Sequence, residues 1–359
     1  MSVSLSNSPP QSIEVLFNKI ATLSTETKEQ LSEFVKQEIF KDKNTFQQKI
    51  KEHARNSCPR CNSGRSIKNG VVRGIQRHKC KNCGKNYSDS TGQSIHWIHF
   101  KDKWFEYIEM LFNGKYQSCR ETASELKVNH KTTFRWRHKV LNGLNIALEE
   151  NFKGIIEMDD LHFVFSEKGR KGLSTPSKRG KEKGKKKPGD GELSVKVMAT
   201  MDRVDTLKLD VVRIGRLKAN DIKRTFMDNN IDLSSNILTS DMHPSISSFA
   251  KKIGIKHETF YAKNHCRAKV YHVNTINEKA NRINNLVNIT LKGVSTKYLQ
   301  NYMNWFKMLE LMKFIPMNYF NWTFTNSNAW FKWQEREVTY KNFLTNFSNI
   351  KYSNNVKFG

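Results

Sequence analysis

Residues 154–165, GIIEMDDLHFVF, decide how the chain is expected to fold. A short apolar run rich in Ile, Val and Phe is typical of a buried strand. Asp159 and Asp160 interrupt this run, and acids within a buried strand cost folding energy unless something pairs with them. Because side chains alternate along a strand, the two aspartates must point to opposite faces, so only one can serve a given site.

Further strands and helices follow along the chain. Strand patterns recur in LSVKVMATMDR (193–203), DTLKLDVVRI (205–214) and NILTSDM (236–242), and the last leads into the helical pattern PSISSFAKKIG (244–254). Strands followed by helices predict a mixed α/β domain. A Gly- and Pro-containing segment dense in Lys and Arg, residues 168–191, separates the first two strands and is expected to form a loop.

A third carboxylate, Asp241, ends the strand NILTSD. Carboxylates at the ends of neighbouring strands can hold Mg²⁺ or Mn²⁺, which polarise a phosphodiester and help to deprotonate water or a 3′ hydroxyl. The residues alone leave two other interpretations open. Asp241 can cap the helix that follows it, and the pair Asp159 and Asp160 can close a turn.

Length and charge narrow the class of protein. A chain of 359 residues suggests roughly two to three domains. Lys and Arg number 61 against 34 Asp and Glu, a net charge of +27, which makes nucleic acid the first candidate partner. No apolar run approaches the ~18 residues that span a bilayer, and the start lacks a signal-peptide pattern. We therefore expect a soluble protein with no membrane partner, cytoplasmic and associated with the nucleoid.

Four of the six cysteines form two close pairs. Cys58-Pro-Arg-Cys61 and Cys80-Lys-Asn-Cys83 are separated by 18 residues, a spacing that suits a tetrahedral structural Zn²⁺ site. A module this small has little core, so zinc would supply much of its folding energy. Reduced, unligated cysteines are the alternative, while six cysteines are too few for a disulfide scaffold.

Basic side chains decorate the same module, as expected for phosphate contacts, although a merely solvated basic surface is the alternative. These residues are Arg60, Arg65, Lys68, Arg73, Arg77, Lys79, Lys81 and Lys85.

Residues 118–140, SCRETASELKVNHKTTFRWRHKV, alternate a short helix, a turn and a longer basic helix. Ala123 and Leu126 would pack inward, and Asn129 would cap the second helix. Such a helix could enter a major groove, or it could simply pack as a helical hairpin with a basic surface. The expected DNA-contacting residues are Thr132, Thr133, Arg135, Arg137 and Lys139.

Taken in order, these segments resemble a bacterial insertion-sequence transposase with an N-terminal zinc ribbon and a DDE-type catalytic domain. The resemblance covers residues 58–306 and is carried by TTFRWRHK, by the acidic pair with its basic insert, by LTSD, and by HVNTIN with GVSTKYLQNY. It implies an RNase H-like mixed sheet flanked by helices. It also implies metal-dependent strand cleavage and transfer at transposon ends.

The same resemblance assigns the candidate catalytic residues. The family's first two aspartates match Asp159 and Asp241, and its third position, Glu in some branches and Asn in others, falls on Asn277 in HVNTIN. An asparagine oxygen can coordinate a hard cation but brings no charge. Glu278, about 100° around the helix, is the rival third ligand. Where the family often has Lys, this chain has Asn284, so a phosphate-positioning cation would come from elsewhere, such as Lys279 or Arg282.

The insert between the first two catalytic strands is the last candidate DNA contact. Such a charged segment can be a solvated tail. The position of the insert beside the expected active site instead favours binding to the DNA backbone, and we expect this binding to weaken steeply with salt. The residues expected to bind are Lys178, Arg179, Lys185, Lys186 and Lys187.

The expected organisation has five parts. They are a helical leader (1–55), a zinc ribbon (56–99), a helix-turn-helix (100–148), an RNase H-like domain (149–310) with its basic insert, and an aromatic-rich tail (311–359).

The leading hypothesis is a transposase that binds double-stranded DNA at insertion-sequence ends and at the target, with Zn²⁺ as a structural ion and Mg²⁺ or Mn²⁺ at the catalytic site. Because two ends must be paired, a homo-oligomer on DNA, at least a dimer, is expected. One alternative is a domesticated or inactive DNA-binding protein that does not cut. Another is a stand-alone nuclease that cuts but does not join.

Overall fold

Two compact units, Met1–Thr91 and Gly92–Gly359, make up the chain in the computed structural model. The structure describes residues 22, 24–27, 48, 50–52, 54–93, 95–96, 98–113, 116–144, 152–169, 194–226, 232–261, 266–268 and 270–313. Most of the predicted leader, the basic insert from residue 170 to 191 and the tail from residue 314 lie outside the described residues.

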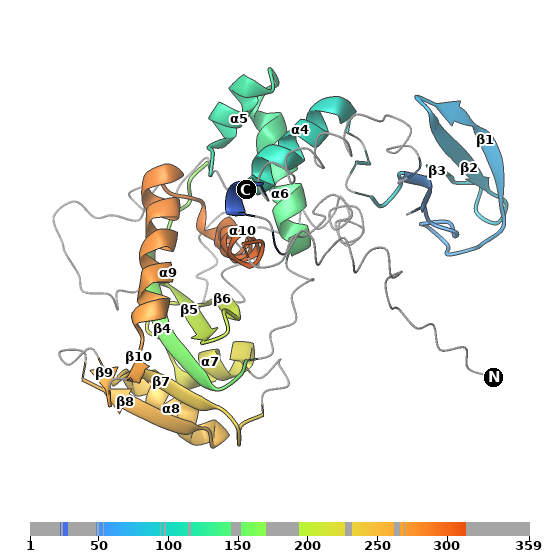
Figure 1. The fold of residues 1–359 in the computed structure, drawn as a ribbon. Helices are drawn as coiled ribbons and strands as arrows, with labels where there is room; N and C mark the ends of the chain where they lie inside the picture. Colours follow the sequence, from blue (N-terminus) through green and yellow to red (C-terminus); the bar gives the residue numbers. More distant parts are fainter. Residues whose placement is uncertain are drawn as a thin grey trace, which may run out of the picture. The chain divides into compact units, whose positions relative to one another are not determined.

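The first unit contains a three-stranded antiparallel sheet in the order β1-β2-β3 (Figure 1). Its strands are β1 (Ser66–Val72), β2 (Ile75–Cys80) and β3 (Asn86–Ser88). The turn between β1 and β2 consists of Arg73 and Gly74, both with positive φ, as a tight two-residue hairpin turn requires. Tyr87 is buried against Cys58 and Cys80, so the small core of this unit lies at the cysteines.

The second unit begins with helices α4 (Lys101–Phe112), α5 (Cys119–Glu125) and α6 (His130–Gly143). Trp136 joins α6 to α4, because its ring lies edge-on at 5.4 Å from both Trp104 and Tyr107. All three rings are buried. Trp136 is therefore a core residue of this unit.

A mixed sheet of five strands follows, in the order β6-β5-β4-β7-β8. The strands β4, β5 and β6 pair antiparallel, while β7 runs parallel to β4 and β8 parallel to β7. The bounds are β4 (Ile155–Val164), β5 (Ser194–Asp202), β6 (Leu207–Ile214), β7 (Ile237–Asp241) and β8 (Lys256–Phe260). The predicted strands at residues 154–165, 193–203, 205–214 and 236–242 are thereby confirmed.

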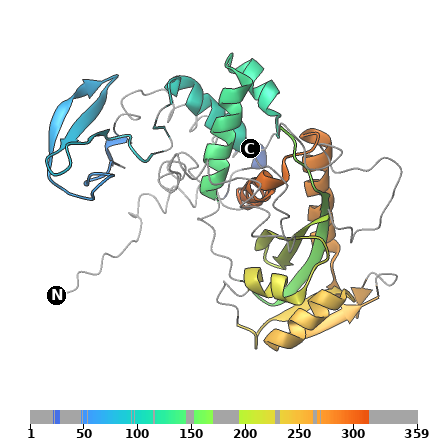
Figure 2. The same ribbon diagram turned by 180° about the vertical axis from the view of Figure 1, so that it is seen from behind.

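Helices α7 (Ala219–Phe226) and α8 (Pro244–Ile253) cover one face of this sheet, as Figure 2 shows from behind. Ile156 and Met158 of β4 join Ile246 and Phe249 of α8 in one buried cluster there. The predicted helix at residues 244–254 is therefore confirmed. Gly254, at φ 76°, ends the helix in a left-handed conformation that favours glycine.

The other face of the sheet is covered by the chain that follows β8. A small hairpin of β9 (Cys266–Arg267) and β10 (Tyr271–His272) leads into α9 (Asn274–Asn284), which continues as a six-residue π-helix. Ile276 and Ile283 of α9 are fully buried, whereas Asn277 and Asn281 are exposed. These two stripes match the amphipathic pattern of the sequence.

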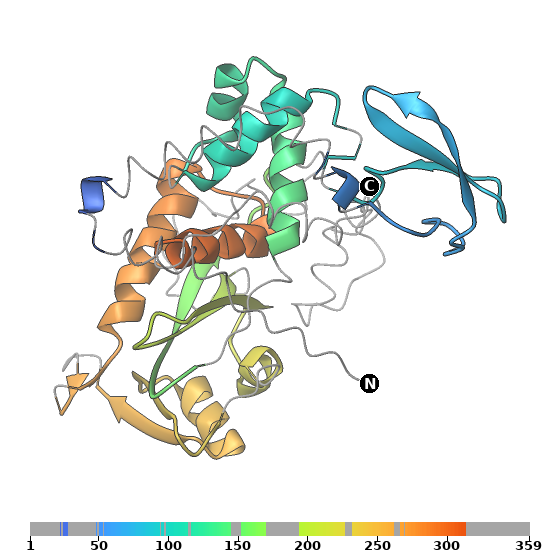
Figure 3. The same ribbon diagram turned by 45° about the vertical axis from the view of Figure 1, so that its right-hand side comes forward.

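Helix α10 (Leu299–Leu311) lies between the sheet and the three leading helices (Figure 3). Gln300 accepts from the N–H of Val211 and donates to the carbonyl of Leu209 on β6, both at 2.8 Å. At the other side, the Trp305 indole donates to the carbonyl of Leu111 at 2.9 Å. Helix α10 therefore links the leading helices to the sheet.

The mixed α/β fold class, a sheet flanked by helices on both faces, is confirmed, and it agrees with the RNase H-like domain that the resemblance implied. None of the helices in the described part of the chain has the length and apolar character needed to span a bilayer.

Candidate functional site

The four paired cysteines converge on one point of the first unit. All four sulfur atoms lie within 4.8 Å of one another. Cys58 Sγ is 3.6 Å from Cys83 Sγ, and Cys61 Sγ is 3.6 Å from Cys80 Sγ. The predicted ligand set is thus brought together, and it can hold a metal ion.

The backbone explains why each pair can present two sulfurs. In the first turn Cys58 N–H donates to Ser63 O, and Asn62 N–H donates back to Cys58 O. The second turn repeats these two hydrogen bonds between Cys80 and residues 84 and 85. Backbone N–H groups of Cys61 and Arg60 point at the first sulfur and lower the pKa of Cys58 to about 6. A thiolate is the form that binds metal.

The surface around the cysteines is basic throughout. Of the eight predicted phosphate-contacting side chains in this unit, all but Arg77 are exposed. The stretch from Cys58 to Ser88 contains no Asp or Glu. This surface therefore attracts anions.

Helices α5 and α6 form the predicted helix-turn-helix pair. Ser118 caps α5 by accepting from Glu121 N–H, and the Glu121 carboxylate accepts from Ser118 N–H, which completes a capping box. Ala123 and Leu126 are buried, as the sequence predicts. Asn129 accepts from Lys131 N–H at 2.9 Å and so begins α6.

The residues of α6 that the sequence assigned to DNA divide into two groups. Arg135 is exposed, Thr132 is half-buried, and half-buried Lys139 donates to the carbonyl of His96 at 2.9 Å. Thr133 and Arg137 are 0% and 2% exposed. Their burial corrects the expectation for these two positions, because neither side chain can reach a DNA backbone in this structure.

Specific partners explain the burial of Thr133 and Arg137. The Thr133 hydroxyl donates to the carbonyl of Cys119 at 2.7 Å, which ties α6 to the start of α5. The Arg137 guanidinium donates to the carbonyl of Gln117 at 2.7 Å and lies over the Trp305 ring at 5.1 Å. Both residues therefore pack the helical unit.

The first two candidate aspartates lie on adjacent parallel strands, Asp159 in the middle of β4 and Asp241 at the carboxyl end of β7. Ile155 aligns with Ile237, and Glu157 aligns with Thr239. If the pairing of Glu157 with Thr239 is extended by two residues along both strands, Asp159 lies beside Asp241 on the same face of the sheet. That face is the one covered by α9, because the buried cluster under α7 and α8 uses the alternate positions of β4.

The electrostatics of Asp159 reflect this arrangement. Burial and, to a smaller extent, the nearby charges of Asp241 and Asp160 raise the pKa of Asp159 to about 7, against a hydrogen bond from the backbone N–H of Asp160 that lowers it. That N–H lies 2.8 Å from Asp159 Oδ1. A nearby cation would stabilise the ionised form of a carboxylate in this environment.

Asp160 points to the opposite face, as strand alternation requires. Its carboxylate pairs with Lys196 at 3.1 Å, and the Lys196 side chain is fully buried. His162 and His243 lie 3.4 Å and 4.0 Å from the same carboxylate. Asp160 therefore neutralises a buried lysine.

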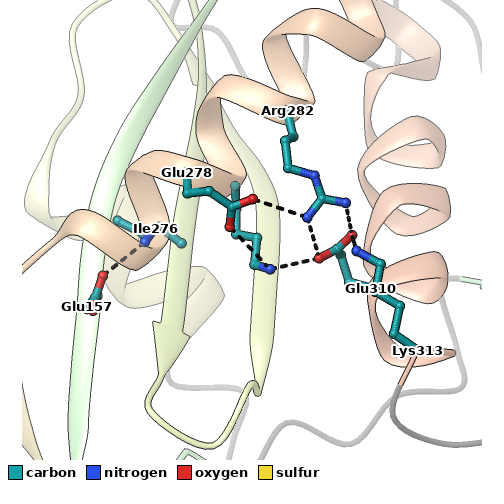
Figure 4. A network of polar contacts seen from close by, with 7 residues as sticks. Glu157, Ile276, Glu278, Arg282, Glu310 and Lys313 are labelled. Atoms are coloured by element: carbon teal, nitrogen blue, oxygen red, sulfur yellow. Dashed lines mark hydrogen bonds and ion pairs between the residues drawn. The ribbon is translucent and has the colours of Figure 1, made fainter. Parts of the chain in front are cut away.

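Asn277 and Glu278 occupy different flanks of α9. Asn277 is exposed. It follows Ile276, whose backbone N–H donates to the carboxylate of Glu157 on β4. Glu278 is drawn into ion pairs with Lys279 at 3.4 Å and Arg282 at 3.3 Å. Figure 4 shows the Glu278 side chain turned toward Arg282 and α10, away from Glu157 on β4.

The cations considered as substitutes for the missing lysine are engaged in the same network. Glu310 of α10, whose side chain is 6% exposed, pairs with Lys279 and Lys313 at 2.8 Å and 2.7 Å. Arg282 pairs with Glu310 through both of its terminal nitrogens (Figure 4). Lys279 and Arg282 thus tie α9 to α10.

One acidic residue near the aspartates was not singled out in the sequence. Glu157 of β4 is 1% exposed, and its Oε2 accepts from the N–H of Ile276 at 2.9 Å. The sequence does indicate its location, because Glu157 comes two residues before Asp159 in GIIEMDD and therefore lies on the same face of the strand. The five predicted DNA contacts in the insert lie outside the described residues.

Among solved structures, the chain aligns with a pre-cleavage Mos1 transpososome at 10% identity and a TM-score of 0.23, covering 64% of this chain and 80% of that one. A Mos1 strand transfer complex aligns at 11% identity and a TM-score of 0.20, with coverage of 64% and 79%. Likeness at these TM-scores does not establish a shared fold.

Sequence comparison gives two findings. A NUMOD1 domain model matches residues 105–132, which run from α4 into the start of α6. An uncharacterized protein in the transposable element ISH50 of Halobacterium salinarum is 31% identical over 129 residues, 33% of this chain. The match spans 42% of that protein's length. Homology to a protein of a transposable element thus supports the resemblance of this chain to an insertion-sequence transposase.

Proposed function

We propose that the protein is a DNA transposase that binds insertion-sequence ends and catalyses metal-dependent strand cleavage and strand transfer. The observation that carries the proposal is the alignment of Asp159 in β4 with Asp241 at the end of the adjacent parallel strand β7, on the face covered by α9. The homology to a transposable-element protein supports the same function.

Asp159, Asp241 and Asn277 would hold two Mg²⁺ or Mn²⁺ ions. The fit rests on charge, because Asp159 is held at a raised pKa partly by the repulsion of Asp241, which a divalent cation would relieve. Bound there, such ions supply Lewis-acid polarisation of a phosphodiester and a nucleophile at neutral pH. The side chains themselves orient the site and supply its negative charge.

The geometry of α9 favours Asn277 over Glu278 as the third ligand. Lys279 and Arg282 face α10, and α10 packs on β6 at one edge of the sheet. Asn277 lies about 160° around the helix from Lys279. It therefore lies on the flank of α9 that faces away from α10, which supports Asn277 as a ligand shared with Asp159 and Asp241.

The remaining parts would recognise DNA. Zinc is the ion that suits the cysteine cluster, because four thiolates at a Zn–S distance of about 2.3 Å lie about 3.8 Å apart in a tetrahedron. The NUMOD1 match, in a type of domain that binds DNA, supports a DNA-binding role for α5 and α6. Exposed Arg135 and Lys131 would contact phosphates, and the basic insert would add sequence-independent contacts.

Assembly and location follow from the same proposal. Cutting and joining two ends requires both ends in one complex, so the protein would act as at least a dimer on DNA. A protein with a net charge of +27 that acts on chromosomal DNA would reside in the cytoplasm with the nucleoid.

A binding-only protein is the second candidate function, and two substitutions favour it. Asn277 brings no charge to the metals, and Asn284 stands where the family often has lysine. Because Lys279 and Arg282 form ion pairs with Glu310, neither replaces that lysine in this arrangement.

A strand-cleavage assay on the element's own ends, with and without Mn²⁺, tests the proposal. The wild type should cut, Asp159→Ala and Asp241→Ala should bind but not cut, and Glu278→Ala should still cut. Joining of the cut end to a second duplex separates a transposase from a nuclease. A wild type that binds the ends and cuts none of them would support the binding-only protein.

A further inference from the structure

The first turn of helix α9 is capped from the sheet. The N–H groups of a helix's first turn have no partner inside the helix and need one from outside. Val273, which precedes α9, has an apolar side chain and cannot supply it. Glu157 of β4 does so instead, because its Oε2 accepts from the N–H of Ile276 at 2.9 Å (Figure 4).

The Glu157 carboxylate is buried, and its charge is balanced. Arg203, in the turn between β5 and β6, lies 3.0 Å from Glu157 Oε1, and His272 of β10 lies 3.6 Å from it. The positive end of the α9 dipole adds to this balance. A buried carboxylate is expensive unless it is paired, so this arrangement fixes the side chain in one place.

Glu157 connects two of the three elements that carry the candidate ligands, β4 and α9. Asp159 is two residues further along β4, about 7 Å away on the same face. Asn277 directly follows Ile276, about 1.5 Å further along the helix axis. One side chain therefore joins the strand of Asp159 to the first turn of α9, which ends at the third candidate ligand, Asn277.

We propose that Glu157 is a positioning residue, which fixes Asn277 opposite Asp159 and Asp241 by capping α9. The inference rests on the proposed function, since it concerns the same metal site. Glu157 itself would touch neither metal nor DNA.

Two measurements on the full-length, zinc-loaded chain test this role. Hydrogen exchange of the peptide that contains Ile276 reports on the cap without reference to metal. Titration with Mn²⁺, followed by the electron paramagnetic resonance signal of the free ion, reports on the site. Asp159→Ala defines how much Mn²⁺ binding belongs to that site.

Glu157→Ala should speed exchange at Ile276 about fivefold, the effect of one lost hydrogen bond. It should also raise the half-saturating Mn²⁺ concentration about tenfold, as loss of a residue that orients a metal ligand does. Glu157→Gln keeps an oxygen that can accept from Ile276 N–H, so its exchange and Mn²⁺ affinity should stay close to those of the wild type. Glu157→Asp keeps the charge but shortens the reach, so it should show the same faster exchange and weaker Mn²⁺ binding. It keeps the test available if Glu157→Ala does not fold.

Glu258→Gln is the matched control. Glu258 is an acid of the same sheet whose ion pair with Lys256, at 3.9 Å, lies on the outer strand β8. Its removal should leave both measurements unchanged. Wild-type Mn²⁺ affinity in Glu157→Asp, or unchanged exchange in Glu157→Ala, would overturn the positioning role. If Asp159→Ala itself leaves Mn²⁺ binding unchanged, the proposed metal site fails instead.

Discussion

The raised pKa of Asp159 makes stability depend on pH. Burial and the charge of Asp241 favour the protonated form in the folded chain, so its pKa there is about 7 against an ordinary value near 4. The stability that this group contributes is present below pH 4 and is lost as the pH rises from about 4 through 7. The size of this pKa shift limits the resulting change in the free energy of unfolding to about 4 kcal/mol.

Asp159→Asn should remove this dependence when no Mg²⁺ or Mn²⁺ is added. Urea unfolding at pH 4.5 and 8 should show the variant gaining stability over the wild type as the pH rises. Asp205→Asn, an exposed acid in the turn between β5 and β6, is the control and should show no such gain. A difference between Asp159→Asn and wild type that stays constant with pH would show that Asp159 titrates normally.

Arg135 and Arg137 should respond differently to alanine, although two positions separate them. Arg135 is exposed, so its loss should weaken DNA binding and reduce the slope of log affinity against log salt by about 1. Arg137 is buried over Trp305, so its loss should lower the free energy of unfolding. Fluorescence anisotropy over a salt series and urea unfolding separate the two effects. A reduced salt slope in a fully stable Arg137→Ala protein would contradict its packing role.

The environment of single residues was the least predictable part from sequence. A polar stretch such as HKTTFRWRHK indicates a solvated helix, and Arg135 fits that expectation. Arg137 does not, because the surface that buries it comes from α10, far along the chain. Glu157 was overlooked for the same reason, since its partner Ile276 lies 119 residues away.

Helices α9 and α10 are joined by one buried carboxylate with three cations. Burial alone would raise the pKa of Glu310, but hydrogen bonds from Arg282, Lys279 and Lys313 outweigh it and lower the pKa to about 2. The stabilisation is therefore present above the ordinary value near 4.5 and is lost as the pH falls toward 2. Because Arg282 and Lys313 are partly exposed, we expect a contribution of about 1–3 kcal/mol.

Glu310→Gln should destabilise the protein at pH 7 by this amount and by much less near pH 3. Urea unfolding at both pH values measures it. Glu106→Gln, an exposed acid on α4, is the control and should cost little at either pH. An equal loss at pH 7 and pH 3 would mean that the lost packing, and not the charge, matters.

The strands and helices could be predicted from local pattern, but their pairing could not. Alternation and apolar runs located β4, β5, β6, β7 and α8 within a few residues. Which strand lies beside which depends on contacts between distant segments. The alignment of Asp159 with Asp241 was therefore an expectation from family resemblance, and the register of β4 and β7 supplies its geometry.

Two compact units should respond independently to loss of the metal. In the first, the small core lies at the cysteines, so Cys80→Ser should abolish zinc binding and unfold residues 54–91. The second unit has its own sheet and should unfold at an unchanged urea concentration. Limited proteolysis and zinc analysis measure both effects. Cys119→Ser, in the second unit, is the control, and cooperative loss of both units in Cys80→Ser would contradict their independence.

The cysteine spacing predicted this first unit better than any other feature, because two short turns fix four ligands locally. Net charge predicted a polyanionic partner in the same direct way. Neither feature indicated that α10 would link the leading helices to the sheet, since that link depends on the hydrogen bond from Trp305 to Leu111.

Anomalous X-ray diffraction from crystals soaked in Mn²⁺ tests the central claim most directly. The account predicts density for Mn²⁺ between the carboxylates of Asp159 and Asp241, with the Asn277 amide oxygen facing it, and none there in Asp159→Ala crystals. Crystals in which the wild-type carboxylates bind no Mn²⁺, or bind it without Asn277 nearby, would contradict it.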